Sequence, residues 1–260
     1  MAPRAGILLI LCVCYLRPTV TQAAFDTYEP ALTPSSISTA DTLHKNEKFF
    51  APQGWLAYGL TDRLTISWDW FVAFGGIPAG YLRYQVPAGE QAFSVELYAA
   101  HFRDSTADER VVDYMTEHRQ AASWARLNWS SARIHDFRLH AYAGRSYYNY
   151  LRYAPYQGPQ FQEKTYTQDS NIDYGLGLEW MVSPALRAHL NYIAGNTFTL
   201  FDQIPHKTMV VMGLHFAPFD RSRAKILSRM RFELNAISVD IPDAHYNKFF
   251  PLFPVFYWQW

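Results

Sequence analysis

Residues 172–180 read Ile-Asp-Tyr-Gly-Leu-Gly-Leu-Glu-Trp, so every second side chain is large and apolar. Side chains of a β-strand point alternately to opposite faces, which separates Ile172 and Trp180 from Asp173 and Glu179. The same alternation recurs in residues 64–70, 137–143, 186–194 and 230–236. The repetition predicts an all-β protein built from amphipathic strands.

The lengths of these segments favour a membrane-spanning protein. Segments such as 91–101 and 119–129 match the roughly 9 to 11 residues that cross a bilayer at a tilt, whereas soluble strands usually have about 5 or 6. No stretch after the N-terminal region has the roughly 18 to 20 consecutive apolar residues of a membrane-spanning helix. We therefore expect a closed antiparallel transmembrane β-barrel. A soluble β-sandwich is the alternative, because alternation also fits a strand between a protein core and water.

The connections between the segments alternate in length. Short connections occur at 61–63, 87–90, 130–136 and 183–185, and longer polar ones at 101–119, 152–170 and 195–206. This asymmetry is typical of an outer-membrane barrel with short periplasmic turns and longer external loops. The strands predicted between them are 49–60, 63–73, 79–86, 91–101, 119–129, 136–150, 167–181, 186–195, 206–217, 229–239 and 250–260. An even number requires one more strand, expected within 25–40, so we predict about twelve strands; ten is the alternative.

The N-terminus has the features of a secretory signal. Arg4 precedes an apolar run from Gly6 to Leu16, and Thr21 to Ala23 offer small residues for cleavage. Residues 1–23 are therefore predicted to be a signal peptide that is cleaved on export. Residues 24–48 are then a lead-in or the first strand, and residues 49–260 form the transmembrane β-barrel.

The end of the chain shows a specific resemblance. Residues 251–260 read Pro-Leu-Phe-Pro-Val-Phe-Tyr-Trp-Gln-Trp. They resemble the C-terminal strand of outer-membrane β-barrel proteins of Gram-negative bacteria, which ends on Phe or Trp and has apolar residues at alternate preceding positions. Phe256, Trp258 and Trp260 match that pattern, and residues 58–64 are similar to a strand-turn-strand phrase of such barrels. The resemblance implies insertion into the outer membrane by the barrel-assembly machinery, with these three aromatic residues as the assembly signal.

Aromatic residues make up 17% of the chain, and many lie near the ends of predicted strands. Trp and Tyr are favoured at the boundary between membrane and water, where an apolar ring and a polar NH or OH are accommodated together. The aromatic residues expected at this boundary, in contact with outer-membrane lipids, are Trp55, Trp70, Trp129, Trp180 and Tyr192.

Charged and polar residues occupy the opposite faces of the predicted strands. The residues expected to face the lumen are Asp69, Arg83, Glu96, Arg138, His140, Asp173, Glu179, Arg187, His189, Arg231 and Glu233. They would line a polar permeation path or brace a closed interior by pairing with one another. His140, His189 and His215 all fall on lumen faces, and we interpret them as hydrogen-bonded interior groups rather than metal ligands.

Motifs for enzymatic chemistry are missing from the sequence. It has no Gly-rich phosphate loop, no His-Glu-x-x-His run and no Gly-x-Ser-x-Gly elbow, and no cofactor is predicted. The formal net charge is zero, which gives no reason to expect a nucleic-acid partner. The expected function is a small porin-like channel or a barrel that binds a small solute. The alternatives are a closed structural or surface-interaction barrel and, third, a lipid hydrolase that uses Ser146 and His118.

Overall fold

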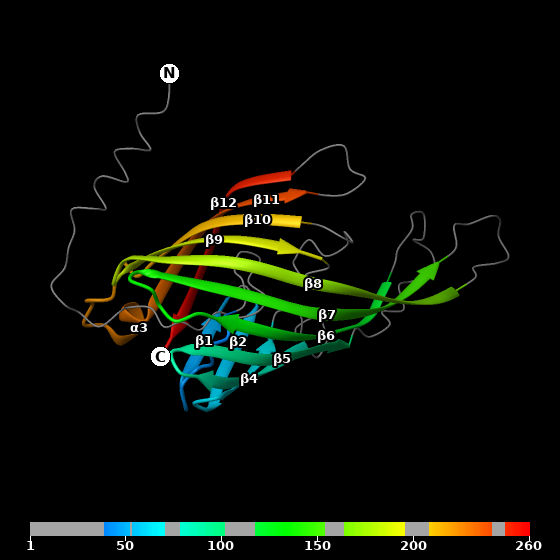
Figure 1. Cartoon of the computed structure of the whole chain (residues 1–260), viewed down its shortest axis with the longest axis horizontal. Coiled ribbons are helices and arrows are strands. Elements are labelled where there is room, and N and C mark those ends of the chain that lie inside the picture. Colours follow the sequence, from blue (N-terminus) through cyan, green and yellow to red (C-terminus); the bar gives the residue numbers. More distant parts are fainter. Residues whose placement is uncertain are drawn as a thin grey trace, which may run out of the picture.

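The computed structural model describes residues 39–52, 54–70, 79–101, 118–153, 164–195, 208–240 and 248–260. They form a closed barrel in which each strand pairs antiparallel with its neighbours in sequence and β1 pairs with β12 (Figure 1). The strands are β1 (Lys48–Ala51), β2 (Trp55–Thr61), β3 (Leu64–Asp69), β4 (Ala79–Ala88), β5 (Gln91–His101), β6 (His118–Ser130), β7 (Phe137–Tyr153), β8 (Lys164–Ser183), β9 (Leu186–Ala194), β10 (Thr208–Phe216), β11 (Met230–Asp240) and β12 (Lys248–Gln259). The predicted all-β barrel of about twelve strands is confirmed.

The extra strand lies elsewhere than the sequence indicated. Residues 49–60 were expected to form one strand, but they form β1 and β2, which pair with each other across a turn that contains Pro52 and Gly54. Proline donates no backbone hydrogen bond, and Gly54 has a φ of 147°, a conformation that favours glycine. Residues 39–47 contain no strand. The predicted signal peptide and most of the expected 25–40 strand lie outside the described residues.

The two ends of the barrel differ in the length of their connections. At one end, here the short-turn end, the strands are joined by residues 62–63, 89–90, 131–136 and 184–185. At the other, the long-loop end, the longer connections are 70–78, 102–117, 154–163, 195–207 and 241–247. Two connections break the rule: 52–54 is short at the long-loop end, and 217–229, which contains the helix α3 (Lys225–Ser228), is long at the short-turn end (Figure 1). Among the described residues, no helix is long and apolar enough to cross a membrane.

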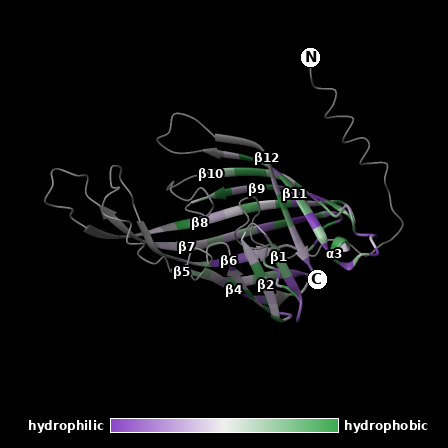
Figure 2. Ribbon diagram, turned by 180° about the vertical axis from the view of Figure 1, so that it is seen from behind, coloured by the Kyte–Doolittle hydropathy of each residue, from purple (hydrophilic) through white to green (hydrophobic). Residues whose placement is uncertain are grey.

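The strands are apolar and exposed on the outside of the barrel. In β10 the burial alternates strictly, with Val210, Met212 and Leu214 exposed and Val211 and His215 buried. Figure 2 shows hydrophobic and hydrophilic residues mixed along the same strands. Leu176 of β8 is 61% exposed and Trp68 of β3 is 56% exposed, although each is paired with a residue of a neighbouring strand.

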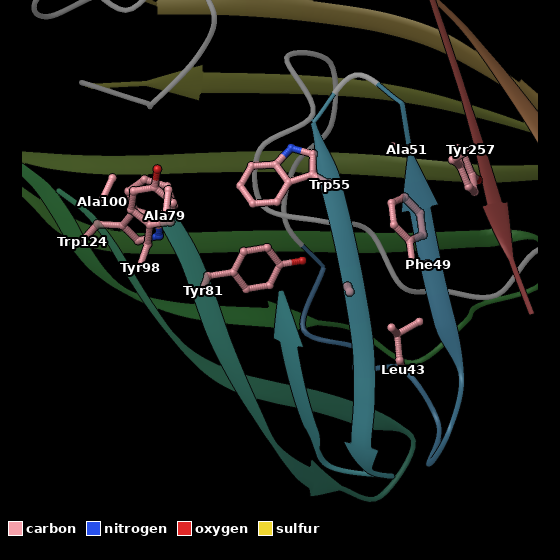
Figure 3. Packing of buried hydrophobic residues seen from close by; sticks show 11 residues of the cluster. Leu43, Phe49, Ala51, Trp55, Ala79, Tyr81, Tyr98, Ala100, Trp124 and Tyr257 are labelled. Atoms are coloured by element: carbon pink, nitrogen blue, oxygen red, sulfur yellow. The ribbon is translucent and has the colours of Figure 1, made fainter. Parts of the chain in front are cut away.

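One apolar part of the interior is an aromatic cluster on the β1–β6 side. Its members are Leu43, Phe49, Ala51, Trp55, Ala57, Ala79, Tyr81, Tyr98, Ala100, Trp124 and Tyr257 (Figure 3). Tyr98 and Trp124 stack with their ring centroids 3.7 Å apart, and Phe49 and Tyr257 stack at 5.0 Å. Trp55 was expected at the outer boundary, but its ring lies inside, 5.5 Å from that of Tyr81. The turn between β1 and β2 interrupts the alternation of inward and outward side chains, and in β2 the inward positions begin with Trp55.

Candidate functional site: the barrel lumen

All the residues predicted to face the lumen have inward-facing positions. His189 is half-buried, and the other ten have at most 8% of their surface exposed, with Arg83, Glu96 and Asp173 fully buried. A soluble β-protein has the reverse arrangement, with charged side chains outside and apolar ones inside. This barrel therefore encloses charged side chains in its lumen.

A short N-terminal segment, residues 39–43, crosses the lumen near the short-turn end. We call it the strap. The backbone N–H of Ala40 donates to Oγ of Ser130 (2.9 Å), and the backbone N–H of Leu43 donates to Oγ1 of Thr65 (2.8 Å). Because Ser130 belongs to β6 and Thr65 to β3, the strap links strands that are not neighbours in the barrel wall.

Asp41 fixes the strap by ion pairing. Its carboxylate accepts two hydrogen bonds from Arg138 of β7, at 2.6 and 3.0 Å, which is the bidentate geometry typical of strong Arg–carboxylate pairs. Its backbone carbonyl accepts a hydrogen bond from Nη1 of Arg83 at 3.0 Å. Arg83 in turn donates to Glu96 from Nε (2.9 Å) and Nη2 (2.7 Å). The strap thus joins two buried arginines whose charges are each balanced by a carboxylate.

A series of polar contacts, here the polar belt, runs along the inner wall through Ser130, His140, Glu179, Arg187 and His215. Oγ of Ser130 lies 2.8 Å from Nδ1 of His140, whose Nε2 lies 3.7 Å from Glu179. Arg187 donates to Glu179 (3.1 Å) and to Nδ1 of His215 (2.9 Å). The belt extends over five strands, β6 to β10.

A second group of lumen residues lies around Arg126 and is not among the predicted ones. The guanidinium of Arg126 lies over the rings of Trp124 (4.5 Å) and Tyr142 (4.9 Å) and contacts Asp173 at 3.4 Å. Arg126 lies on the same face of β6 as Trp124 and Asn128, so the two-residue period of the strand predicts its inward position. Asp41 offered no comparable signal, because it lies outside any periodic segment.

The lumen contains polar atoms that lack a hydrogen-bond partner within the described part of the chain. They include Oδ1 of Asn128, the hydroxyl of Tyr142 and Oδ1 of Asn235. Buried polar groups in proteins are nearly always paired with protein, water or an ion. Their presence is expected of a lumen that holds water or an ion beside its ion pairs.

The interior also contains a Ser–His–Glu sequence of contacts. Ser130, His140 and Glu179 are in the order of a hydrolase triad. Ser130 is fully buried, however, and its hydroxyl already accepts the N–H of Ala40. In this arrangement a substrate carbonyl has no access to the hydroxyl.

The structure does not bring the predicted hydrolase pair together. Ser146 faces the lumen and donates a hydrogen bond to Asp173. It lies opposite Trp124 of β6, whereas His118 lies opposite Leu151. Six residues along a strand correspond to about 20 Å, so the two do not form a catalytic pair.

Four of the five predicted boundary aromatics lie on the outer face. Trp180 and Tyr192 are exposed, Trp70 and Trp129 are half-buried, and Trp55 is the exception described above. Trp129 and Trp180 lie near the short-turn end, and Trp70 and Tyr192 near the long-loop end. A groove of about 580 Å³ lies on β2–β5, lined by Leu56, Ala57, Tyr58, Ile66, Ser67, Trp68, Ala79, Gly80 and Ala99.

The C-terminal strand presents Phe256, Trp258 and Trp260 on the outer face and buries Tyr257. β12 pairs with β11 along most of its length, but its register with β1 is limited to Gln259–Phe49 and Trp258–Phe50. Pro254 therefore lies in a stretch that has only one paired neighbour, and a strand tolerates proline there.

No protein-family model matches the sequence, and no curated protein matches it. The fold and the lumen define a closed, antiparallel, twelve-stranded β-barrel protein.

Proposed function

We propose that this chain is an outer-membrane β-barrel protein of a Gram-negative bacterium, with a lumen that the polar belt braces and the strap closes. The observation that supports the proposal most is the inverted distribution of side chains. Residues such as Leu97, Leu127 and Leu176 are exposed on the outer face, while Arg83 and Glu96 are fully buried inside. An apolar outer face of this extent is costly in water and stable in lipid.

Further features support this location. The apolar groove on β2–β5 offers a surface to lipid acyl chains, and aromatic residues flank the outer face at both ends. In the proposed orientation the short-turn end faces the periplasm and the long loops face outward. The outward aromatics of β12 are available to the barrel-assembly machinery, for which we propose them as the recognition signal.

The closed state is supported by the pairing of the lumen charges. Arg83 pairs with Glu96, Arg138 with Asp41, and Arg187 with Glu179. Paired and desolvated charges brace a lumen, whereas the charges of an open pore face water and passing ions. We therefore propose a structural or surface-interaction role, without catalysis, in preference to constitutive passage of solutes.

The location is tested by cell fractionation and by gel mobility with and without heating. We expect the chain in the outer-membrane fraction, with a folded band that shifts only after boiling. Recovery as a soluble protein whose mobility does not depend on heating would contradict the proposal.

A gated small-solute channel is the second candidate, favoured by the strap itself. One five-residue segment provides the closure, and Asp41 is its charged anchor. Asp41→Lys places a cation next to Arg83 and Arg138 and is expected to expel the strap by repulsion. Glu90→Lys is the matched control, because it makes the same change of charge in the exposed turn between β4 and β5.

The measurement is the conductance of purified protein in planar bilayers. The closed-barrel proposal predicts no ion current through the wild type or Glu90→Lys, and steady current through Asp41→Lys. Voltage- or solute-dependent openings of the wild type would favour the gated channel. A wild type that conducts steadily at all voltages would refute closure by the strap.

A further inference from the structure

Three lumen side chains from neighbouring strands converge on one point at the end of the polar belt. They are His189 of β9, His215 of β10 and Glu233 of β11. Each offers one ligand atom, and these atoms lie within 4.8 Å of one another. Nε2 of His215 is 2.9 Å from Nδ1 of His189 and 3.5 Å from Oε1 of Glu233. We propose that these residues bind one divalent first-row transition-metal ion inside the barrel wall.

The spacing of the donor atoms fits such an ion. Tetrahedral ligation with bonds of about 2.0–2.1 Å separates ligand atoms by about 3.3–3.4 Å. The separations of 2.9 and 3.5 Å lie on either side of this value, and the third separation, between His189 and Glu233, is at most 4.8 Å and closes by rotation of the two side chains when they ligate. Two imidazoles with one carboxylate suit Zn²⁺ and its neighbours, while Ca²⁺ and Mg²⁺ prefer ligand sets made of oxygen.

A fourth donor lies beside the three. Asn235 donates from Nδ2 to Oε1 of Glu233 at 2.8 Å, and its Oδ1 has no hydrogen-bond partner among the described residues. A Cβ atom at Gly213 would lie 2.1 Å from this Oδ1 and 2.3 Å from Cε1 of His189. The absence of a side chain at Gly213 therefore provides the space in which the amide oxygen and the imidazole meet.

Arg187 determines how tightly the ion binds. A guanidinium only donates hydrogen bonds, so its contact with Nδ1 of His215 keeps the proton of the neutral ring on Nε2. Ligation by Nε2 requires that proton to move to Nδ1. Arg187 must then give up its contact with Nδ1, while it keeps its hydrogen bond to Glu179. Arg187 also places a positive charge near the ion. Replacement of Arg187 by Gln removes that charge and offers an amide oxygen that can accept the Nδ1 proton. In many metal sites the ligand histidine donates its second N–H to an oxygen in the same way.

The test uses the mature full-length barrel folded in detergent, stripped with a chelator and titrated with Zn²⁺ against a chromophoric competitor. We expect one Zn²⁺ per chain. Loss of a residue that only contacts a metal ligand typically lowers metal affinity roughly 10–100-fold. His189→Gln and Glu233→Gln each remove a ligand and should lower the Zn²⁺ affinity by more than that. Arg187→Gln should instead tighten binding about tenfold, because it removes a positive charge near the ion, a gain that a purely structural role of these residues does not produce.

The control is His44→Gln, which removes an exposed histidine 3.8 Å from Asp62 and should leave the affinity unchanged. Failure of the wild type to bind one ion would overturn the proposal. Unchanged Zn²⁺ affinity in His189→Gln and Glu233→Gln would also overturn it. Loss of Zn²⁺ binding in His44→Gln alone would overturn it as well, because the ion would then be an adventitious ion on the surface.

Folding of each variant is checked by its heat-dependent gel mobility. If the two ligand variants fail to fold, the visible absorption of Co²⁺ bound to the wild type replaces them. Strong bands of four-coordinate Co²⁺ with nitrogen ligands support the site, and the weak spectrum of hydrated Co²⁺ overturns it. These measurements do not depend on whether the barrel conducts ions.

Discussion

Gly213 is the residue over which His189 and Asn235 of the proposed metal site pack. It lies opposite His189 in the register of β9 and opposite Asn235 in that of β11. Both side chains lean over the glycine, which leaves no room for a methyl group between them. A single small residue thus allows side chains from two neighbouring strands to approach each other.

Gly213→Ala is expected to abolish the 1:1 binding of Zn²⁺ and to destabilise the barrel by about 1–3 kcal/mol, because the new methyl group displaces His189 and Asn235. Gly89→Ala is the control: Gly89 has a φ of 66°, and its added Cβ meets nothing within 4 Å. That variant pays only a backbone cost of about 1 kcal/mol. The measurements are Zn²⁺ titration and urea unfolding in lipid vesicles. Equal Zn²⁺ affinities in the two variants would argue against the steric role of Gly213.

At the scale of the elements, the strands with strict alternation were predictable from the sequence. The expected segments 91–101 and 186–195 coincide closely with β5 and β9. The two-residue period assigns each side chain to one face of the strand, and the face that contains the apolar residues is the outer one. The inward orientation of His189, His215 and Glu233 could therefore be predicted from the sequence.

Other features depend on contacts between distant parts of the chain. Asp41 and Arg138 are 97 residues apart, and nothing in the local sequence of the strap predicts that it enters the lumen. The cluster of His189, His215 and Glu233 similarly required the register of three strands. The β1–β2 turn was missed because apolar and aromatic residues on both sides of it read as one continuous strand.

The outer face of β8 provides a test of membrane contact. Leu176 lies near the middle of β8, opposite Tyr192 of β9, and is 61% exposed, so Leu176→Lys is expected to destabilise the barrel in lipid by about 1–3 kcal/mol, between the values for a cation at the interface and at the bilayer midplane. Ile226→Lys in α3 is the control, because Ile226 is also exposed but lies outside the strands. The measurement is urea unfolding in vesicles. Equal small effects of both variants would indicate that Leu176 faces water.

At the scale of the whole molecule, the barrel wall is uneven. β7 and β8 pair from Phe137–Trp180 to Tyr153–Lys164, whereas the closing seam between β1 and β12 has only two register pairs. Reciprocal backbone bonds between Lys48 and Trp260, at 2.8 and 3.0 Å, extend the seam at the short-turn end. Figure 1 shows the contrast between the long β7 and β8 and the short β1 and β2. The seam is therefore the weakest part of the closed sheet.

This difference predicts where the barrel opens first. Local opening of a sheet requires less free energy where fewer backbone pairs are broken, so amides of residues 48–51 should exchange with deuterium sooner than those of residues 138–147. Tyr257→Ala removes the ring stacked on Phe49 and should speed exchange in β1 without affecting β7. Phe137→Ala, which removes the stacking on Trp180 at the opposite wall, is the matched control and should leave β1 unchanged.

The measurement is hydrogen–deuterium exchange followed by mass spectrometry of the folded barrel. If β1 is protected for as long as β7, or if Tyr257→Ala and Phe137→Ala act alike on β1, the seam is not the point of opening. Faster exchange confined to β1 and the end of β12 would show that the closure of the barrel depends on the ring stacking of Phe49 and Tyr257, because the backbone pairs at the seam are too few to hold it alone.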